Sequence, residues 1–123
     1  MLASRMNQSV RHDTLIFKLP ENLGSANCQS FAARCDDLIA EIRDGQVRNI
    51  VVDCHDTDGL GGTALGLLLG VWKSAVHHKA GFVLSGLSPA NWDVVHVCRL
   101  NRLWRNYGSL EEAIIAVEAD TDE

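Results

Sequence analysis

The sequence predicts an α/β domain with a small, mostly parallel sheet of four or five strands flanked by about four helices. Short β-branched segments alternate with segments of helical periodicity, and this order requires crossover connections between parallel strands. The chain has 123 residues, 46% hydrophobic and 22% charged, which is typical of one folded domain rather than two. We expect this domain over residues 8–118, with flexible ends at 1–7 and 119–123.

Two strands and one long helix are predicted in the first half of the chain. Residues 14–19 (TLIFKL) are rich in strand-forming residues, and Val10 is expected to pair with them through a turn at 12–13. Residues 25–44 have apolar side chains three and four positions apart, which indicates a helix with one buried face. Residues 48–53 contain an Ile-Val-Val run, which is typical of a buried strand.

The second half continues the alternation. A leucine-rich helix is predicted to begin at residue 62 or 63 and to end at 79, and a strand follows at 81–86. A Ser-Pro pair caps the next helix, which runs to residue 98. A short strand is expected over 103–107. A Ser-x-x-Glu capping box then opens a last helix, which runs from 109 to 117.

The charge balance excludes two classes of partner. Eleven basic and sixteen acidic residues give a net charge of -5, so we expect neither nucleic-acid binding nor attraction to an anionic membrane. The longest nearly apolar run, residues 60–72, is too short to span a bilayer. The first ten residues lack the apolar region of a signal peptide, and we expect a cytoplasmic protein.

Metal, cofactor and enzymatic sites are not predicted. The cysteines at 28, 35, 54 and 98 form no Cys-x-x-Cys motif, and we expect them to be reduced, buried packing residues. The acidic and histidine residues at 53–58 have no spacing suited to zinc or calcium, and they are interpreted as a solvated turn. His96 and Cys98 have no orienting partner in sequence, so no nucleophile and base can be assembled.

The most informative segment is 53–70 (DCHDTDGLGGTALGLLLG), where a strand ends and a helix begins. Ligands and partners of open α/β sheets gather at such edges. Residues 59–64 match the dinucleotide pattern G-x-G-x-x-A, but five residues separate them from the strand and the next strand offers no acidic residue to a ribose. Gly62, Gly66 and Gly70 share one helical face, which we expect to lie close to the sheet or to the 25–44 helix.

Residues 50–117 resemble the STAS domain, the fold of bacterial anti-sigma factor antagonists and of the cytoplasmic tails of sulfate transporters. The resemblance rests on an ordered set of segments. The 50–53 strand is followed by a helix containing the pairs Leu65-Gly66 and Leu69-Gly70. The segments GFVLSGLSP (81–89), 100–107 and SLEEA (109–113) then come in the family's order.

The resemblance implies a function in partner switching. In anti-sigma factor antagonists the helix that corresponds to the one after the Asp53 strand begins with Asp-Ser, and a partner serine kinase phosphorylates the serine. The unphosphorylated protein binds this kinase, which is an anti-sigma factor, and thereby frees a sigma factor. The phosphate breaks the contact because it adds negative charge to a packed interface.

The chain departs from the family at this point. In ungapped register Gly61 takes the place of the aspartate and Gly62 that of the phosphoacceptor serine. Thr63 is the nearest hydroxyl, either as a substitute acceptor or as a residue that caps the helix. A register shifted by five residues would instead place Thr57 at the acceptor position; we interpret this second match as a coincidence.

We therefore expect a non-enzymatic STAS interaction module, an anti-sigma factor antagonist without the usual acceptor, whose partner is a serine-kinase anti-sigma factor. It would be a monomer or weak dimer. Exposed leucines would supply the apolar part of its surface and acidic residues the selectivity. The residues expected to bind the partner are Asp56, Asp58, Leu60, Gly61, Gly62, Thr63 and Leu67. The alternative is a sensor that holds a small anion or nucleotide on the helix N-terminus at 61–63.

Overall fold

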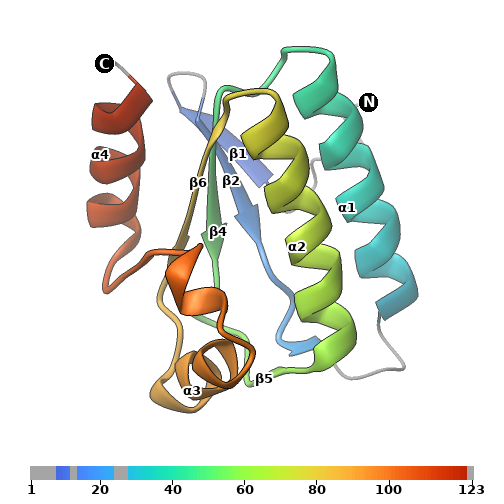
Figure 1. The fold of residues 1–123 in the computed structure, drawn as a ribbon, viewed down its shortest axis with the longest axis vertical. Coiled ribbons are helices and arrows are strands. Elements are labelled where there is room, and N and C mark those ends of the chain that lie inside the picture. Colours follow the sequence, from blue (N-terminus) through green and yellow to red (C-terminus); the bar gives the residue numbers. More distant parts are fainter. Residues whose placement is uncertain (1–7, 12–13, 24–27, 122–123) are drawn as a thin grey trace.

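A computed structural model describes residues 8–11, 14–23 and 28–121. The main sheet has five strands in the order β1-β2-β4-β6-β7, with β1 antiparallel to β2 and the other neighbours parallel (Figure 1). These strands are β1 (Gln8–Arg11), β2 (Thr14–Lys18), β4 (Asn49–Asp53), β6 (Gly81–Ser85) and β7 (Asn106–Tyr107). The predicted fold class is confirmed, and so is the pairing of Val10, which lies opposite Leu15. The turn expected at 12–13 lies outside the described residues.

Helices cover both faces of the sheet. α1 and α2 lie side by side on one face and α4 lies on the other, while α3 sits at the lower end of the sheet in Figure 1. The helices are α1 (Cys28–Arg43), α2 (Gly62–His77), α3 (Pro89–Val97) and α4 (Leu110–Thr121). The predicted caps of α3 and α4 are present, because Ser88 Oγ accepts from the Asn91 N–H and Ser109 Oγ from the Glu112 N–H, each at 3.1 Å.

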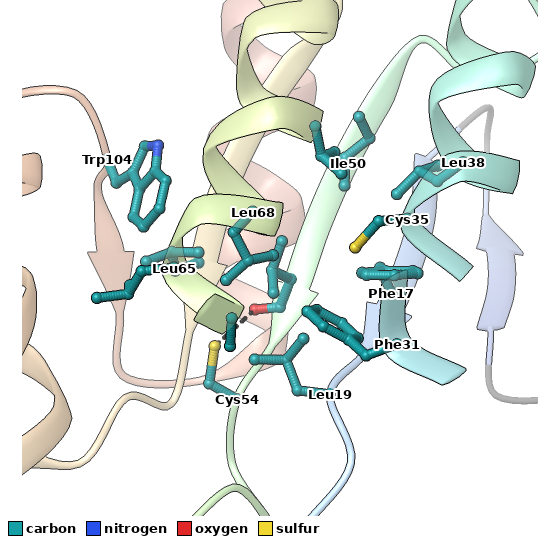
Figure 2. Close-up of a cluster of buried hydrophobic side chains, with 14 of the residues drawn as sticks. Phe17, Leu19, Phe31, Cys35, Leu38, Ile50, Cys54, Leu65, Leu68 and Trp104 are labelled. Carbon is teal, nitrogen blue, oxygen red and sulfur yellow. Dashed lines mark hydrogen bonds between the residues drawn. The ribbon is translucent and has the colours of Figure 1, made fainter. Parts of the chain in front are cut away.

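The larger core lies between the sheet and the pair α1 and α2 (Figure 2). Side chains from the sheet, α1 and α2 meet there, among them Phe17, Phe31, Leu38, Ile50, Leu65 and Leu68. A smaller core on the opposite face joins Val51 and Val83 to Ala113 and Val117 of α4. Strand β4 is therefore buried on both faces, which explains its unbroken Ile-Val-Val run.

The structure differs from the prediction near residue 103. A 3-10 helix, η3 (Leu100–Arg102), occupies the approach to the predicted strand, and β7 is only two residues long. The reason is Trp104, whose side chain is 1% exposed. Its backbone N–H donates to Leu100 O, so this part of the chain turns inward instead of extending. α4 is also longer than predicted, since it continues to Thr121.

The glycines of α2 do not face the sheet or α1 as expected. A Cβ atom placed on Gly62, Gly66 or Gly70 meets no atom within 4 Å, and the first two residues are exposed. The close packing of α2 uses the other face of the helix, with Leu65 and Leu68. The glycine face is therefore open to solvent.

The cysteines are buried with one exception. Cys28, Cys35 and Cys54 are buried, and burial raises the pKa of the Cys35 and Cys54 thiols to about 12. Cys98 is exposed, contrary to the prediction, because it caps the C-terminus of α3 on its solvent side. Within the described residues no group of three or more metal-ligating side chains occurs, and no helix has the length and apolarity to cross a membrane.

Candidate functional site

The candidate site is built where β4 leads through a loop into α2. A second, two-stranded parallel sheet supports this loop, with β3 (Asn22–Leu23) paired to β5 (Gly59–Leu60). Sequence patterns did not predict it, because two-residue strands carry no periodicity. Leu23 and Leu60 are opposite each other in this ladder, and both are buried.

Three hydrogen bonds hold the loop in place. Thr57 Oγ1 donates to Pro20 O at 2.8 Å, and the Asp58 N–H donates to Glu21 O at 2.9 Å. On the other side Asn91 Nδ2, from the first turn of α3, donates to Thr57 O at 3.2 Å. Both side chains are buried, so the loop between β4 and α2 is fixed from two directions.

The shifted register offers no accessible hydroxyl. Thr57 is only 4% exposed, and its hydroxyl is engaged with the Pro20 carbonyl. A kinase would have to open the loop to reach this oxygen. In this conformation Thr57 is therefore not accessible to a kinase.

Helix α2 begins without any side-chain cap. Gly61 is the N-cap residue, with φ -84° and ψ 173°, and its carbonyl accepts the first helical hydrogen bond from the Leu65 N–H at 3.0 Å. Gly61 and Gly62 are both exposed. The two glycines therefore lie at the tip of the helix, as the sequence predicted.

The backbone does not require glycine at either position. Neither residue has a positive φ, a Cβ atom on Gly61 would contact only Leu23 O, at 3.8 Å, and one on Gly62 would contact nothing within 4 Å. Larger residues, such as aspartate at 61 and serine at 62, would therefore fit here without backbone strain.

Thr63 does not cap the helix. It stands in the first turn, after Gly62, with an exposed side chain. Of the two threonines at 57 and 63, Thr63 is therefore the one whose side chain is accessible.

The leucines of the predicted surface behave differently from each other. Leu60 is 5% exposed, so the expectation that it offers apolar area to a partner is wrong; its side chain belongs to the core beneath α2. Leu67 is partly exposed and packs against the edge of the same core. The apolar contribution of this surface is therefore smaller than expected.

The surface around the helix tip is acidic. Asp56 and Asp58 are exposed, as predicted. Lys18 Nζ lies 2.9 Å from Asp56 Oδ2, and this hydrogen bond raises the pKa of the lysine. An open depression of about 400 Å³ beside the tip is lined by Asn22, Leu23, Gly59, Leu60, Gly61, Gly62 and Thr63, with no basic side chain.

The histidine of the loop is not simply solvated. His55 Nδ1 lies 2.7 Å from Asp53 Oδ1, and His55 Nε2 lies 3.4 Å from Gly108 O. The hydrogen bond to Asp53 raises the pKa of the imidazole. Gly86, with φ +75°, lies directly against the ring, because a Cβ atom there would be 2.4 Å from it. The His55 ring thus contacts the chain at the carboxyl ends of β4, β6 and β7.

The family model of the STAS domain matches residues 5–113. Comparison with curated proteins gives no significant match.

Several solved structures share the fold. A protein from Thermotoga maritima described as an anti-sigma factor antagonist has a TM-score of 0.78 at 20% identity, over 90% of this chain and 92% of its own. A serine-to-glutamate variant of RsbS from Moorella thermoacetica has a TM-score of 0.81 at 17% identity, over 94% and 97%. Phosphorylated SpoIIAA from Bacillus has a TM-score of 0.71 at 20% identity, over 89% and 95%.

Proposed function

Because the chain belongs to the STAS domain family, we propose that it is a non-enzymatic interaction module that acts as an anti-sigma factor antagonist in the cytoplasm. The partner would be a serine-kinase anti-sigma factor. It would dock on the start of α2, at Gly61, Gly62 and Thr63, and on the neighbouring acidic loop at Asp56 and Asp58. Leu67 would contribute the adjoining apolar contact.

One observation carries this proposal. The tip of α2 is exposed, uncapped and without side chains at Gly61 and Gly62, while the loop that leads to it is fixed by hydrogen bonds from Thr57 and Asn91. A rigid surface loses little conformational entropy on binding. Bare backbone also lets a partner approach closely.

The acidic surroundings favour a protein partner over the alternative, a small anion or nucleotide. The unpaired N–H groups at the start of α2 would attract an anion. However, no basic side chain lines the depression beside them, and Asp58 and Glu21 are exposed at the same edge. Lys18 is already paired with Asp56. The local charge therefore disfavours a small anion, which leaves a protein partner as the favoured occupant.

The central experiment uses a charge placed at the acceptor position. The partner is first identified by co-purification from the native host, and its affinity for the purified chain is then measured by calorimetry. Gly62→Asp should weaken binding by about tenfold or more, because it places an unpaired carboxylate in the interface. Gly62→Asn, which has nearly the same volume and no charge, separates the effect of charge from that of bulk.

We expect Gly62→Asp to fold as well as the native chain, so weaker binding would not reflect unfolding. A carboxylate in the first turn stabilises a helix, and Gly62 has open space for the side chain. Gly66→Asp places the same charge one turn further along the same face and tests how far the interface extends. If Gly62→Asp binds the partner as tightly as the native chain, the partner docks elsewhere.

We further propose that the chain lacks the phosphorylation switch. With the cognate kinase and ATP, the native chain should gain no phosphate by intact-mass measurement, whereas Gly62→Ser should gain one. If the native chain is modified and Thr63→Val prevents this, Thr63 is the substitute acceptor and the switch is intact.

A further inference from the structure

A second exposed surface lies at the end of α3 and around η3. We call it the α3–η3 patch; it consists of Val97, Arg99, Arg102, Leu103 and Arg105. Val97 is 82% exposed and Leu103 is 42% exposed, and the three arginines are exposed as well. Large apolar side chains that stay in water next to unpaired cations are typical of interaction surfaces.

The arginines form a positive island on an acidic protein. Among the described residues, none of the three has a carboxylate within ion-pair distance, unlike Lys18, which is paired with Asp56. They are three of the eleven basic residues, so eight remain elsewhere against sixteen acidic residues. The island is therefore not part of a general basic surface.

The backbone under the patch is fixed. Arg99 has φ +62°, a left-handed conformation that glycine adopts at lower cost, directly after the C-terminal cap of α3. The Arg99 N–H donates to His96 O and the Leu103 N–H to Leu100 O, both at 2.9 Å. The next residue, Trp104, is 1% exposed and lies in the core. Arg99 is the N-cap residue of η3 and Arg102 is its last residue, so both belong to the same short turn.

We propose that the α3–η3 patch is a second docking surface and that its occupant is a segment of a partner protein with clustered acidic residues and at least one apolar side chain. Guanidinium groups bind carboxylates in paired hydrogen bonds. Val97 and Leu103 supply the apolar contact, which a nucleic-acid backbone would not use. This inference does not rest on the function proposed for the start of α2.

The test is site-specific photo-crosslinking in the native host. The full chain carries benzoylphenylalanine in place of Val97, and the cross-linked peptide is identified by mass spectrometry. The expected adduct is a peptide of another protein in which Asp and Glu outnumber Lys and Arg. An adduct with nucleic acid, with lipid, with a second copy of this chain or with a peptide lacking the acidic excess would overturn the proposal, and so would the absence of any adduct.

Two matched variants test the role of the arginines. Arg99→Gly combined with Arg102→Ser and Arg105→Ser should lower the adduct yield by about tenfold or more, since three charge-assisted contacts are lost. The control is Lys79→Gly combined with Arg43→Ser and Lys73→Ser. It removes the same charge and also replaces one residue of positive φ, because Lys79 has φ +61°.

The control variant should give the same adduct yield as the parent. An equal loss of yield in both variants would show that only the net charge matters, and this would refute the proposal. Thermal melting of both variants checks that neither is less stable than the parent. Gly62→Asp should leave the adduct at position 97 unchanged. Its loss in that variant would mean that the two surfaces are one interface, and the claim of a second surface would be wrong.

Discussion

Gly66 offers a direct test of the geometry of α2. It lies in the interior of the helix with an exposed position, no positive φ, and no atom within 4 Å of an added Cβ. Glycine in a helix interior is less stable than alanine by about 1 kcal/mol, mainly because its unfolded chain has more freedom. Gly66→Ala should therefore raise the free energy of unfolding by about 1 kcal/mol.

The assay is equilibrium unfolding in urea. The midpoint should rise with an unchanged slope, because the surface exposed on unfolding stays almost the same. The melting temperature should rise by roughly 3–5 °C for a chain of this size. Gly70→Ala, whose Cβ also meets no atom within 4 Å, should give a similar gain. Ala33→Gly on the exposed side of α1 is the matched control and should lose about 1 kcal/mol.

A neutral or destabilising Gly66→Ala would refute the reasoning. It would mean that the added methyl group meets a neighbour and that the glycine face packs against another element, as the sequence first indicated. A stabilised variant that binds the α2 partner less tightly would instead show that the glycine face serves the contact at a cost in stability.

Three further perturbations test the support of the site. Gly86→Ala should cost about 1–3 kcal/mol in urea titrations, because its Cβ would lie 2.4 Å from the His55 ring at a positive φ. Thr57→Val should cost about 1–2 kcal/mol, since it leaves the Pro20 carbonyl without its donor. The raised pKa of His55 stabilises the fold fully below its ordinary value of 6.5. Native stability relative to His55→Gln should therefore fall as pH rises through the raised pKa, and a constant difference would contradict this assignment.

Sequence patterns predicted the elements of the fold that have enough length to show a period. The strands at 14–19, 48–53 and 81–86 and the long helices were placed within a few residues of their observed bounds. The β3–β5 ladder was missed because each of its strands has two residues. η3 was missed because its turn depends on the burial of Trp104, a tertiary contact without a local signal.

The position of Gly61 and Gly62 at the start of α2 was predictable, but the orientation of the neighbouring side chains was not. Gly61 and Gly62 follow from the register of a strand and a helix, which are both local features. Leu60 was expected to be exposed because glycines and acidic residues surround it in sequence, yet its pairing opposite Leu23 buries it. Thr57 is buried by a hydrogen bond to Pro20, 37 residues away. Contacts of this kind cannot be inferred from one segment alone.

The way in which the loop is fixed bears on which residues position 62 can hold. Thr57 and Asn91 hold the loop from outside the helix, and Gly61 starts α2 without help from a side chain. The geometry of the tip therefore does not depend on the residue at position 62, and serine or glycine can stand there on the same backbone. For this reason Gly62→Ser should create a phosphorylatable tip on the same backbone, and the same protein could then be compared with and without a switch.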